Sequence, residues 1–92
     1  MLADRYEFPP GVAFQQLGDD QDGVMLSLSS GYLYRCNRTA SVVLSALAAG
    51  KSLQEAAEEL AAAFEVPSQR AASDAAALVD DLRHRQLIRQ AA

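Results

Sequence analysis

The sequence predicts an α+β, winged-helix-like domain in which a three-stranded antiparallel sheet is followed by three helices. The length of 92 residues fits a single domain. The first half alternates apolar and polar residues between glycine-containing turns, which is typical of short strands. The second half carries apolar residues at helical spacing together with capping residues, which favours helices.

The strands are expected between residues 12 and 36. Residues 12–17 alternate weakly, and residues 24–29 alternate clearly, with Leu26 and Leu28 on a face that we assign to the core. A turn at residues 29–31 then leads into a third strand over residues 32–36. The three strands therefore form an antiparallel meander.

The helices are expected after residue 37. Asn37 is a good N-cap, and Gly50 ends the first helix as a left-handed residue. Residues 52–55 (SLQE) form a capping box for the second helix, and Ser68 can cap the third. The large residues expected in the core are Phe14, Leu26, Leu28, Leu44, Leu47, Leu60, Phe64, Leu78 and Leu82.

The segment before the sheet, residues 1–11, is expected to be a flexible N-terminal arm because Pro9 and Pro10 block a helix. The domain proper is expected over residues 12–88. The N-terminus does not have the basic start and apolar run of a signal peptide, and no apolar run reaches the roughly 20 residues of a membrane span.

Composition narrows the functional classes. The net charge of −4 argues against a nucleic-acid binder, because phosphate contacts need clustered Lys and Arg, and against anionic membrane surfaces. The single cysteine, Cys36, cannot form an internal disulfide, which fits a reducing cytoplasm.

The sequence does not show a combination of residues that would form an active site. A Cys–His pair would need Cys36 and His84 in contact, and His84 is expected at a solvated helix end. The cluster Asp19, Asp20 and Asp22 does not have the remaining ligands of a calcium loop. We therefore expect a protein that is not an enzyme and that holds neither a cofactor nor a metal.

The third predicted strand does not have the residues that usually protect an exposed sheet edge. The run GYLYRC has no Lys or Pro and one charge, Arg35, whereas exposed edges are usually blunted. A peptide could add to this strand, with the broad apolar face of the last helix as the other wall of a groove. The alternative, that Tyr32, Leu33 and Tyr34 merely fill the core or form cross-strand pairs, stays open here.

An ordered series of short motifs resembles the PqqD-like family of leader-peptide recognition domains. The motifs are Asp22–Gly23, Gly31–Tyr32, Cys36–Asn37, Ser52–Ala57, Asp74 and Leu87–Ile88. Cys36 stands where the family usually has Leu, and Gln86 where Gly is frequent. These departures bear on the assignment to a subfamily more than on the expected fold.

The resemblance implies a non-catalytic adaptor that binds the leader peptide of a ribosomally made precursor antiparallel to the third strand. Among family settings, the chain is most like the stand-alone leader-recognition proteins of lasso-peptide biosynthesis, which implies a leader-cleaving cysteine protease as partner. The alternative within the family is the adaptor of pyrroloquinoline quinone biosynthesis, which serves a radical enzyme. Carried over by position, the implied leader-binding residues are Tyr32, Leu33, Tyr34, Arg35, Ala72, Ala76, Val79, Asp80 and Arg83.

Two other functional classes fit the sequence less well. A small winged-helix DNA-binding regulator would need a basic recognition helix, but the second expected helix, SLQEAAEELAAAFE, is acidic. An enzyme with an unrecognised site would be revealed by turnover of the isolated protein.

Overall fold

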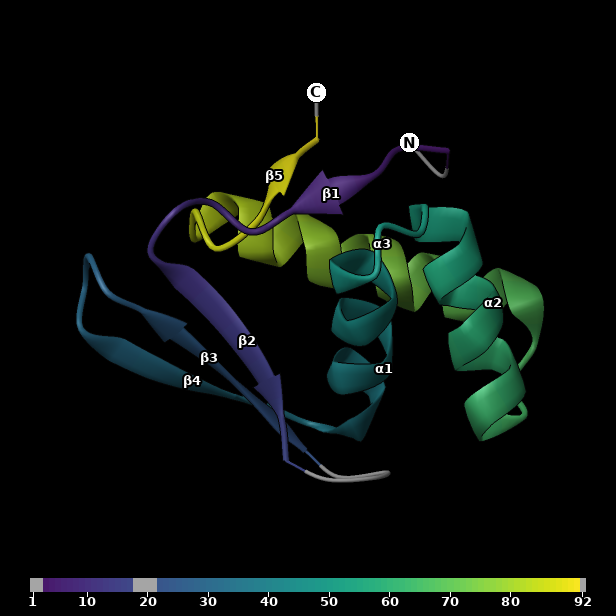
Figure 1. Cartoon of the computed structure of the whole chain (residues 1–92). Helices are drawn as coiled ribbons and strands as arrows, with labels where there is room; N and C mark the ends of the chain where they lie inside the picture. Colours follow the sequence, from purple (N-terminus) through teal and green to yellow (C-terminus); the bar gives the residue numbers. More distant parts are fainter. Residues whose placement is uncertain (1–2, 18–21, 92) are drawn as a thin grey trace.

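The computed structural model describes residues 3–17 and 22–91 and shows the expected order of a small sheet followed by three helices (Figure 1). Strands β2, β3 and β4 form an antiparallel sheet in that order, and two further short strands, β1 and β5, pair with each other. The elements are β1 (Tyr6–Glu7), β2 (Val12–Gln16), β3 (Gly23–Ser27), β4 (Tyr32–Cys36), α1 (Arg38–Ala48), α2 (Leu53–Phe64), α3 (Ser68–His84) and β5 (Arg89–Gln90).

The predicted helix boundaries follow from local hydrogen bonds. The Asn37 side chain accepts from the amide of Ala40 at the start of α1, and Gly50 follows that helix with a φ of +88°. Ser52 and Glu55 complete the predicted capping box of α2. Ser68 does not act as a cap, because it is already the first residue of α3.

The prediction that Leu26 and Leu28 of the second predicted strand face the core was wrong. Met25 is fully buried, whereas Leu26 and Leu28 are 37% and 71% exposed. The physical reason lies at Gly23, where an added Cβ would come within 2.8 Å of Ser41 Oγ on α1. Because α1 and the Phe14 ring crowd this side of the strand, the inner face takes small residues and one flexible methionine, and the leucines face away.

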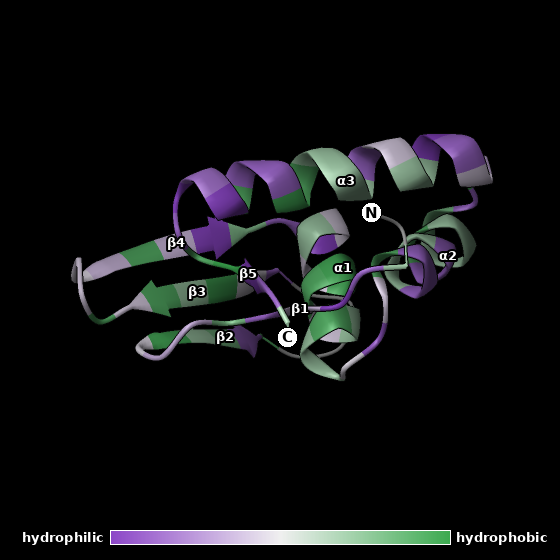
Figure 2. Ribbon diagram, turned by 90° about the horizontal axis from the view of Figure 1, so that it is seen from above, coloured by the Kyte–Doolittle hydropathy of each residue, from purple (hydrophilic) through white to green (hydrophobic). Residues whose placement is uncertain are grey.

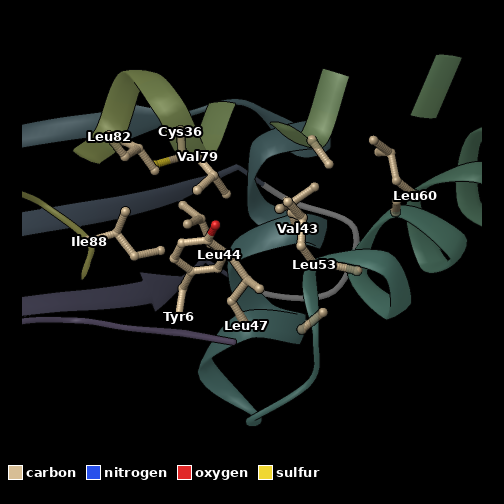
Figure 3. Packing of buried hydrophobic residues seen from close by; sticks show 14 of the residues in the cluster. Tyr6, Cys36, Val43, Leu44, Leu47, Leu53, Leu60, Val79, Leu82 and Ile88 are labelled. Atoms are coloured by element: carbon tan, nitrogen blue, oxygen red, sulfur yellow. The ribbon is translucent and has the colours of Figure 1, made fainter. Parts of the chain in front are cut away.

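The core gathers side chains from all three helices, from the sheet and from both ends of the described chain. Figure 3 shows Tyr6 and Ile88 beside Leu44, with Val79 and Leu82 of α3 next to Cys36. Of the large residues expected inside, Leu44, Leu47, Leu60 and Leu82 are buried, while Phe14, Phe64 and Leu78 pack partly buried against the cluster.

The segment expected to be a flexible arm is packed over much of its described part. β1 pairs antiparallel with β5, and Tyr6 is 3% exposed. The carbonyl of Asp4 accepts a hydrogen bond from the amide of Leu53, and the backbones of Arg5 and Ser52 form an isolated antiparallel β-bridge. The prolines exclude a helix but do not prevent this extended backbone from pairing, so Tyr6 becomes part of the core.

Candidate functional site

Strand β4 forms one edge of the sheet. It pairs with β3 on one side, and no described strand pairs with its other side. Tyr32, Tyr34 and Cys36 alternate with Leu33 and Arg35 along it, so the two sets point to opposite faces. Exposure falls along the first set, from 65% at Tyr32 to 8% at Cys36, which shows that this face runs from solvent into the core.

A cavity of about 360 Å³ opens between β4 and α3, and we call it the β4–α3 groove. In Figure 2, α3 runs along the β4 side of the sheet. The lining is apolar at its base and charged at its rim. The base is formed by Met25, Cys36, Leu44, Leu82 and Leu87, and the rim carries Arg35, Asp81 and Arg85.

The two arginines at the rim form exposed ion pairs. Arg85 Nε donates to Asp81 Oδ2 at 3.1 Å, and an Arg35 nitrogen lies 3.8 Å from Asp22 Oδ2. The exposed fraction of these four side chains lies between 46% and 74%. Such pairs contribute little to stability, so both guanidinium groups can exchange their partner for a carboxylate of a bound molecule.

A second hollow of about 230 Å³ adjoins the groove at the start of α1. The two cavities share Asn37, Ala40 and Leu78 as lining residues. Asp74 is the charged residue that lines the second hollow, and it lies 3.8 Å from Arg70. The groove therefore extends past the end of β4 along α3.

Cys36 is part of the groove but is not arranged as a nucleophile. Burial raises the pKa of its thiol, so the less reactive protonated form dominates near neutral pH. The ring nitrogen Nδ1 of His84 lies 2.7 Å from the carbonyl oxygen of Asp80 at the far side of α3. The structure does not bring Cys36 and His84 together into one cavity.

The four strand residues implied by the family resemblance lie where a peptide could reach them. Tyr34 and Arg35 line the groove, and Tyr32 and Leu33 precede them on the same exposed edge. The rings of Tyr32 and Tyr34 stand edge to face with centroids 6.2 Å apart. The alternative that these residues fill the core does not describe Tyr32 or Leu33, which are both more than half exposed.

The five helix residues implied by the resemblance do not line this groove. Ala72 lines a hollow beside α2, Ala76 is partly buried, and Val79 is fully buried. Asp80 and Arg83 line a hollow together with His84.

The α3 residues that do face β4 are Leu78, Asp81, Leu82 and Arg85. Their spacing of three, four and seven residues marks one helix stripe. Sequence reasoning assigned Leu78 and Leu82 to the core, so the charged residues that continue the same stripe were missed.

The described residues contain no group of three or more His, Cys, Asp or Glu side chains arranged to hold a metal ion. None of the described helices combines the length and apolar character needed to cross a membrane. Asp19 and Asp20, whose cluster with Asp22 the sequence analysis found incomplete as a calcium loop, lie outside the described residues.

Comparison with known families places these features in context. Residues 22–88 match the family described as coenzyme PQQ synthesis protein D (PqqD). The chain belongs to the PqqD family. This confirms the resemblance inferred from the motifs, and the match begins at Asp22–Gly23 and ends at Leu87–Ile88.

Two solved structures have the same fold as this PqqD-family chain. One is described as "Lasso peptide synthetase B1 complexed with the leader peptide"; it has a TM-score of 0.79 and 28% identity over 92% of this chain and 98% of that chain. The other is described as "TbiB1 in Complex with the TbiA(beta) Leader Peptide"; it has a TM-score of 0.81 and 22% identity over 94% of this chain and 98% of that one. No curated protein sequence matches the chain.

Proposed function

We propose that the chain is a non-catalytic adaptor that binds the leader peptide of a ribosomally made precursor and presents it to a processing enzyme. The observation that carries this proposal is the free edge of β4 beside a groove with an apolar base. Backbone groups on such an edge can template an added strand, and the groove can accept alternate side chains of that strand. The similarity to a leader-bound lasso peptide synthetase B1 supports the same leader-binding function.

The proposed peptide contacts combine both walls of the groove. On β4 they are the four residues Tyr32, Leu33, Tyr34 and Arg35, as the resemblance implied. On α3 the proposal uses Leu78 and Arg85, because their side chains line the groove, and Asp81 lies beside Arg85 as its intramolecular partner. Ala72, Ala76, Val79, Asp80 and Arg83 take no direct part in the peptide contact that we propose.

The groove predicts the chemistry of the peptide. An apolar side chain fits above Cys36 and Leu82, and an acidic side chain at the rim can accept hydrogen bonds from Arg35 or Arg85. The chain itself carries a net charge of −4, so this preference for acidic residues comes from the local rim and not from the overall charge.

For the processing enzyme we propose a leader-cleaving cysteine protease of lasso-peptide type, supported by the similarity to lasso peptide synthetase B1. The family description, coenzyme PQQ synthesis protein D, supports an adaptor for a radical enzyme as the second candidate. A DNA-binding role is disfavoured by α2, which exposes Glu55, Glu58 and Glu59.

The test is a titration with the leader peptide encoded by a neighbouring precursor gene, followed by amide chemical shifts. We expect dissociation constants of about 1 μM or tighter, corresponding to about −8 kcal/mol. Shifts should centre on residues 32–36 of β4 and residues 78–85 of α3. No leader binding, together with salt-sensitive binding to duplex DNA, would support the regulator instead.

A second peptide series tests strand addition itself. Leader peptides with a single N-methyl group at successive positions should lose affinity at every second residue, because alternate N–H groups of an added strand face β4. This design leaves the protein unchanged, so loss of binding cannot come from unfolding. Equal tolerance at all positions would contradict strand addition.

A further inference from the structure

A further hollow of about 440 Å³ lies where three parts of the chain meet, and the proposed function does not use it. These parts are the segment before β2, the turn between β3 and β4, and the segment from the end of α3 to β5. We call it the hairpin-end hollow. Its apolar lining comes from Pro9, Pro10, Val12 and Ile88, and its charged lining from Arg83 and Arg89.

The loop that follows α3 separates this hollow from the β4–α3 groove. Arg85 and Leu87 line the groove, whereas Gln86 and Ile88 line the hairpin-end hollow. In Figures 1 and 2 this loop lies toward the same end of the sheet as the turn between β3 and β4. The two cavities are therefore neighbours that share one wall.

The charge of the hairpin-end hollow is locally positive, although the chain has a net charge of −4. No carboxylate is among the described residues that line it. Within residues 3–17 and 22–91, the guanidinium of Arg83 has no ion-pair partner, and Asp80, which shares an adjoining hollow with it, lies near His84 instead. Arg89 Nε donates to Glu7 at 2.6 Å, which fixes the guanidinium and leaves other N–H groups available. The hollow is therefore suited to a carboxylate.

The direction of an added strand decides which part of a peptide comes near this hollow. The sheet is antiparallel throughout, and antiparallel pairing is the more stable kind, so a peptide on β4 would run from Cys36 toward Tyr32. It would leave the sheet at the turn between β3 and β4. Ser29 of this turn lines the hollow and is three residues from Tyr32, a span of at most about 11 Å.

We propose that the hairpin-end hollow binds the part of the leader that follows the added strand, and that this part is acidic. This inference rests on the proposed function. An Asp or Glu of the peptide would accept hydrogen bonds from Arg83 and Arg89, and a neighbouring apolar side chain would lie against Pro9 and Val12. Arg83 takes no part in the contact along the groove, so its role would begin where the strand ends.

A second contact of this kind would do more than raise affinity. Two linked sites make the second binding event intramolecular, so even a weak contact adds to the whole. Because the cationic hollow lies at one end of β4 only, it would also favour one direction of the peptide over the other. The carrier would then recognise the strand and the acidic segment in a fixed order.

The test uses the full chain and three synthetic forms of the leader encoded by the neighbouring precursor gene. The first is the complete leader, and the second ends where the N-methyl series shows that strand pairing ends. The third is complete but carries Asn and Gln in place of every Asp and Glu after the strand. The protein variants are Arg83→Gln and Arg83→Glu, with Lys51→Gln as the charge-matched control, because Lys51 pairs with Glu59 and lines none of these cavities.

We expect the complete leader to bind the unchanged chain about fivefold more tightly than the truncated and amide forms. Arg83→Gln should weaken the complete leader by about threefold and Arg83→Glu by about tenfold, while neither changes binding of the other two forms by more than about twofold. Lys51→Gln should bind all three forms as the unchanged chain does. Only the complete leader should shift the amides of residues 86–90.

Several outcomes would overturn the inference without touching leader binding. One is equal, micromolar affinity for the complete and truncated forms. Another is a leader in which the carboxylates that matter precede the strand, or in which none lies within about six residues after it. If neither the complete nor the truncated form binds the unchanged chain, the proposed function itself is wrong.

Discussion

Asp81 and Arg85 form an ion pair along one turn of α3, with Arg85 Nε 3.1 Å from Asp81 Oδ2, on the rim of the β4–α3 groove. Both side chains are more than half exposed, so the pair contributes little to folding. In the binding mode that we propose, Asp81 would compete with a peptide carboxylate for the same guanidinium group. The pair holds Arg85 at the rim, and by the same proposal it would weaken the attraction of Arg85 for an acidic leader residue.

This relationship predicts opposite effects of two single substitutions. Asp81→Asn should tighten binding of an acidic leader by about threefold, and Arg85→Gln should weaken it by a similar factor, since exposed pairs are worth about 0.2 to 1 kcal/mol. Titration at low and high salt measures both effects, which should shrink at high salt. Loss of binding in Asp81→Asn would show that Asp81 itself contacts the peptide.

Neighbouring positions on α3 should respond differently because one faces the groove and the other faces the core. Leu78→Lys should fold, since its stem can lie along the groove while the amine reaches water, and should weaken leader binding by about tenfold. Val79→Asp buries a carboxylate where the side chain is 0% exposed, and should cost about 4 kcal/mol of folding free energy. Denaturant unfolding and titration of both variants separate binding from stability. A folded Leu78→Lys variant with unchanged affinity would exclude this wall of the groove.

The N-terminal segment should prove part of the stable fold. Tyr6→Ala removes a side chain that is 3% exposed and should cost about 3 kcal/mol of unfolding free energy. Tyr32→Ala removes a tyrosine that is 65% exposed and should cost about 1 kcal/mol or less, which makes it the matched control. Urea denaturation measures both. Equal stability of the two variants would mean that β1 separates from the domain in solution.

The capping box of α2 predicts a specific pH dependence. Hydrogen bonds from the backbone and side chain of Ser52 hold the pKa of the Glu55 carboxyl below its ordinary value of 4.5. Because the folded pKa is the lower one, the stabilisation is complete above the ordinary value and is lost as the pH falls through the folded pKa.

Glu55→Gln keeps a side chain that can complete the box but does not titrate. Its melting temperature should therefore fall less than that of the unchanged chain between about pH 5 and pH 3. Thermal melts over this range provide the measurement. Identical slopes for both proteins would remove Glu55 from the acid response.

Several features were predictable because they depend on neighbours in the chain. Asn37, Gly50 and the Ser52–Glu55 box mark helix ends through contacts within a few residues, and all three are observed. The edge position of β4 also followed from the order of strands in a meander. The family was recognisable because its motifs are short local patterns in a fixed order.

The identity of the α3 residues that line the groove could not be predicted from the sequence in the same way. Helical periodicity places Leu78 and Leu82 on one stripe but does not say how far that stripe stands from β4. In the structure, Leu82 reaches the core while Leu78 stays partly buried at the groove, and Asp81 and Arg85 extend the same side of the helix. The distance between a helix and a strand depends on the side chains packed between them.

The sequence by itself determined the order of sheet and helices, the helix caps and the unblunted edge of β4, because each rests on interactions local in the chain. Only the tertiary structure decided which face of β3 is buried, that Tyr6 joins the core and which residues of α3 line the groove. These outcomes depend on contacts between distant segments, such as the crowding of Gly23 by Ser41 of α1. Hydrophobicity favours burial for Leu26, but α1 crowds the inner side of β3 at Gly23 and Met25 fills the space beside it, so Leu26 lies on the other face and is 37% exposed.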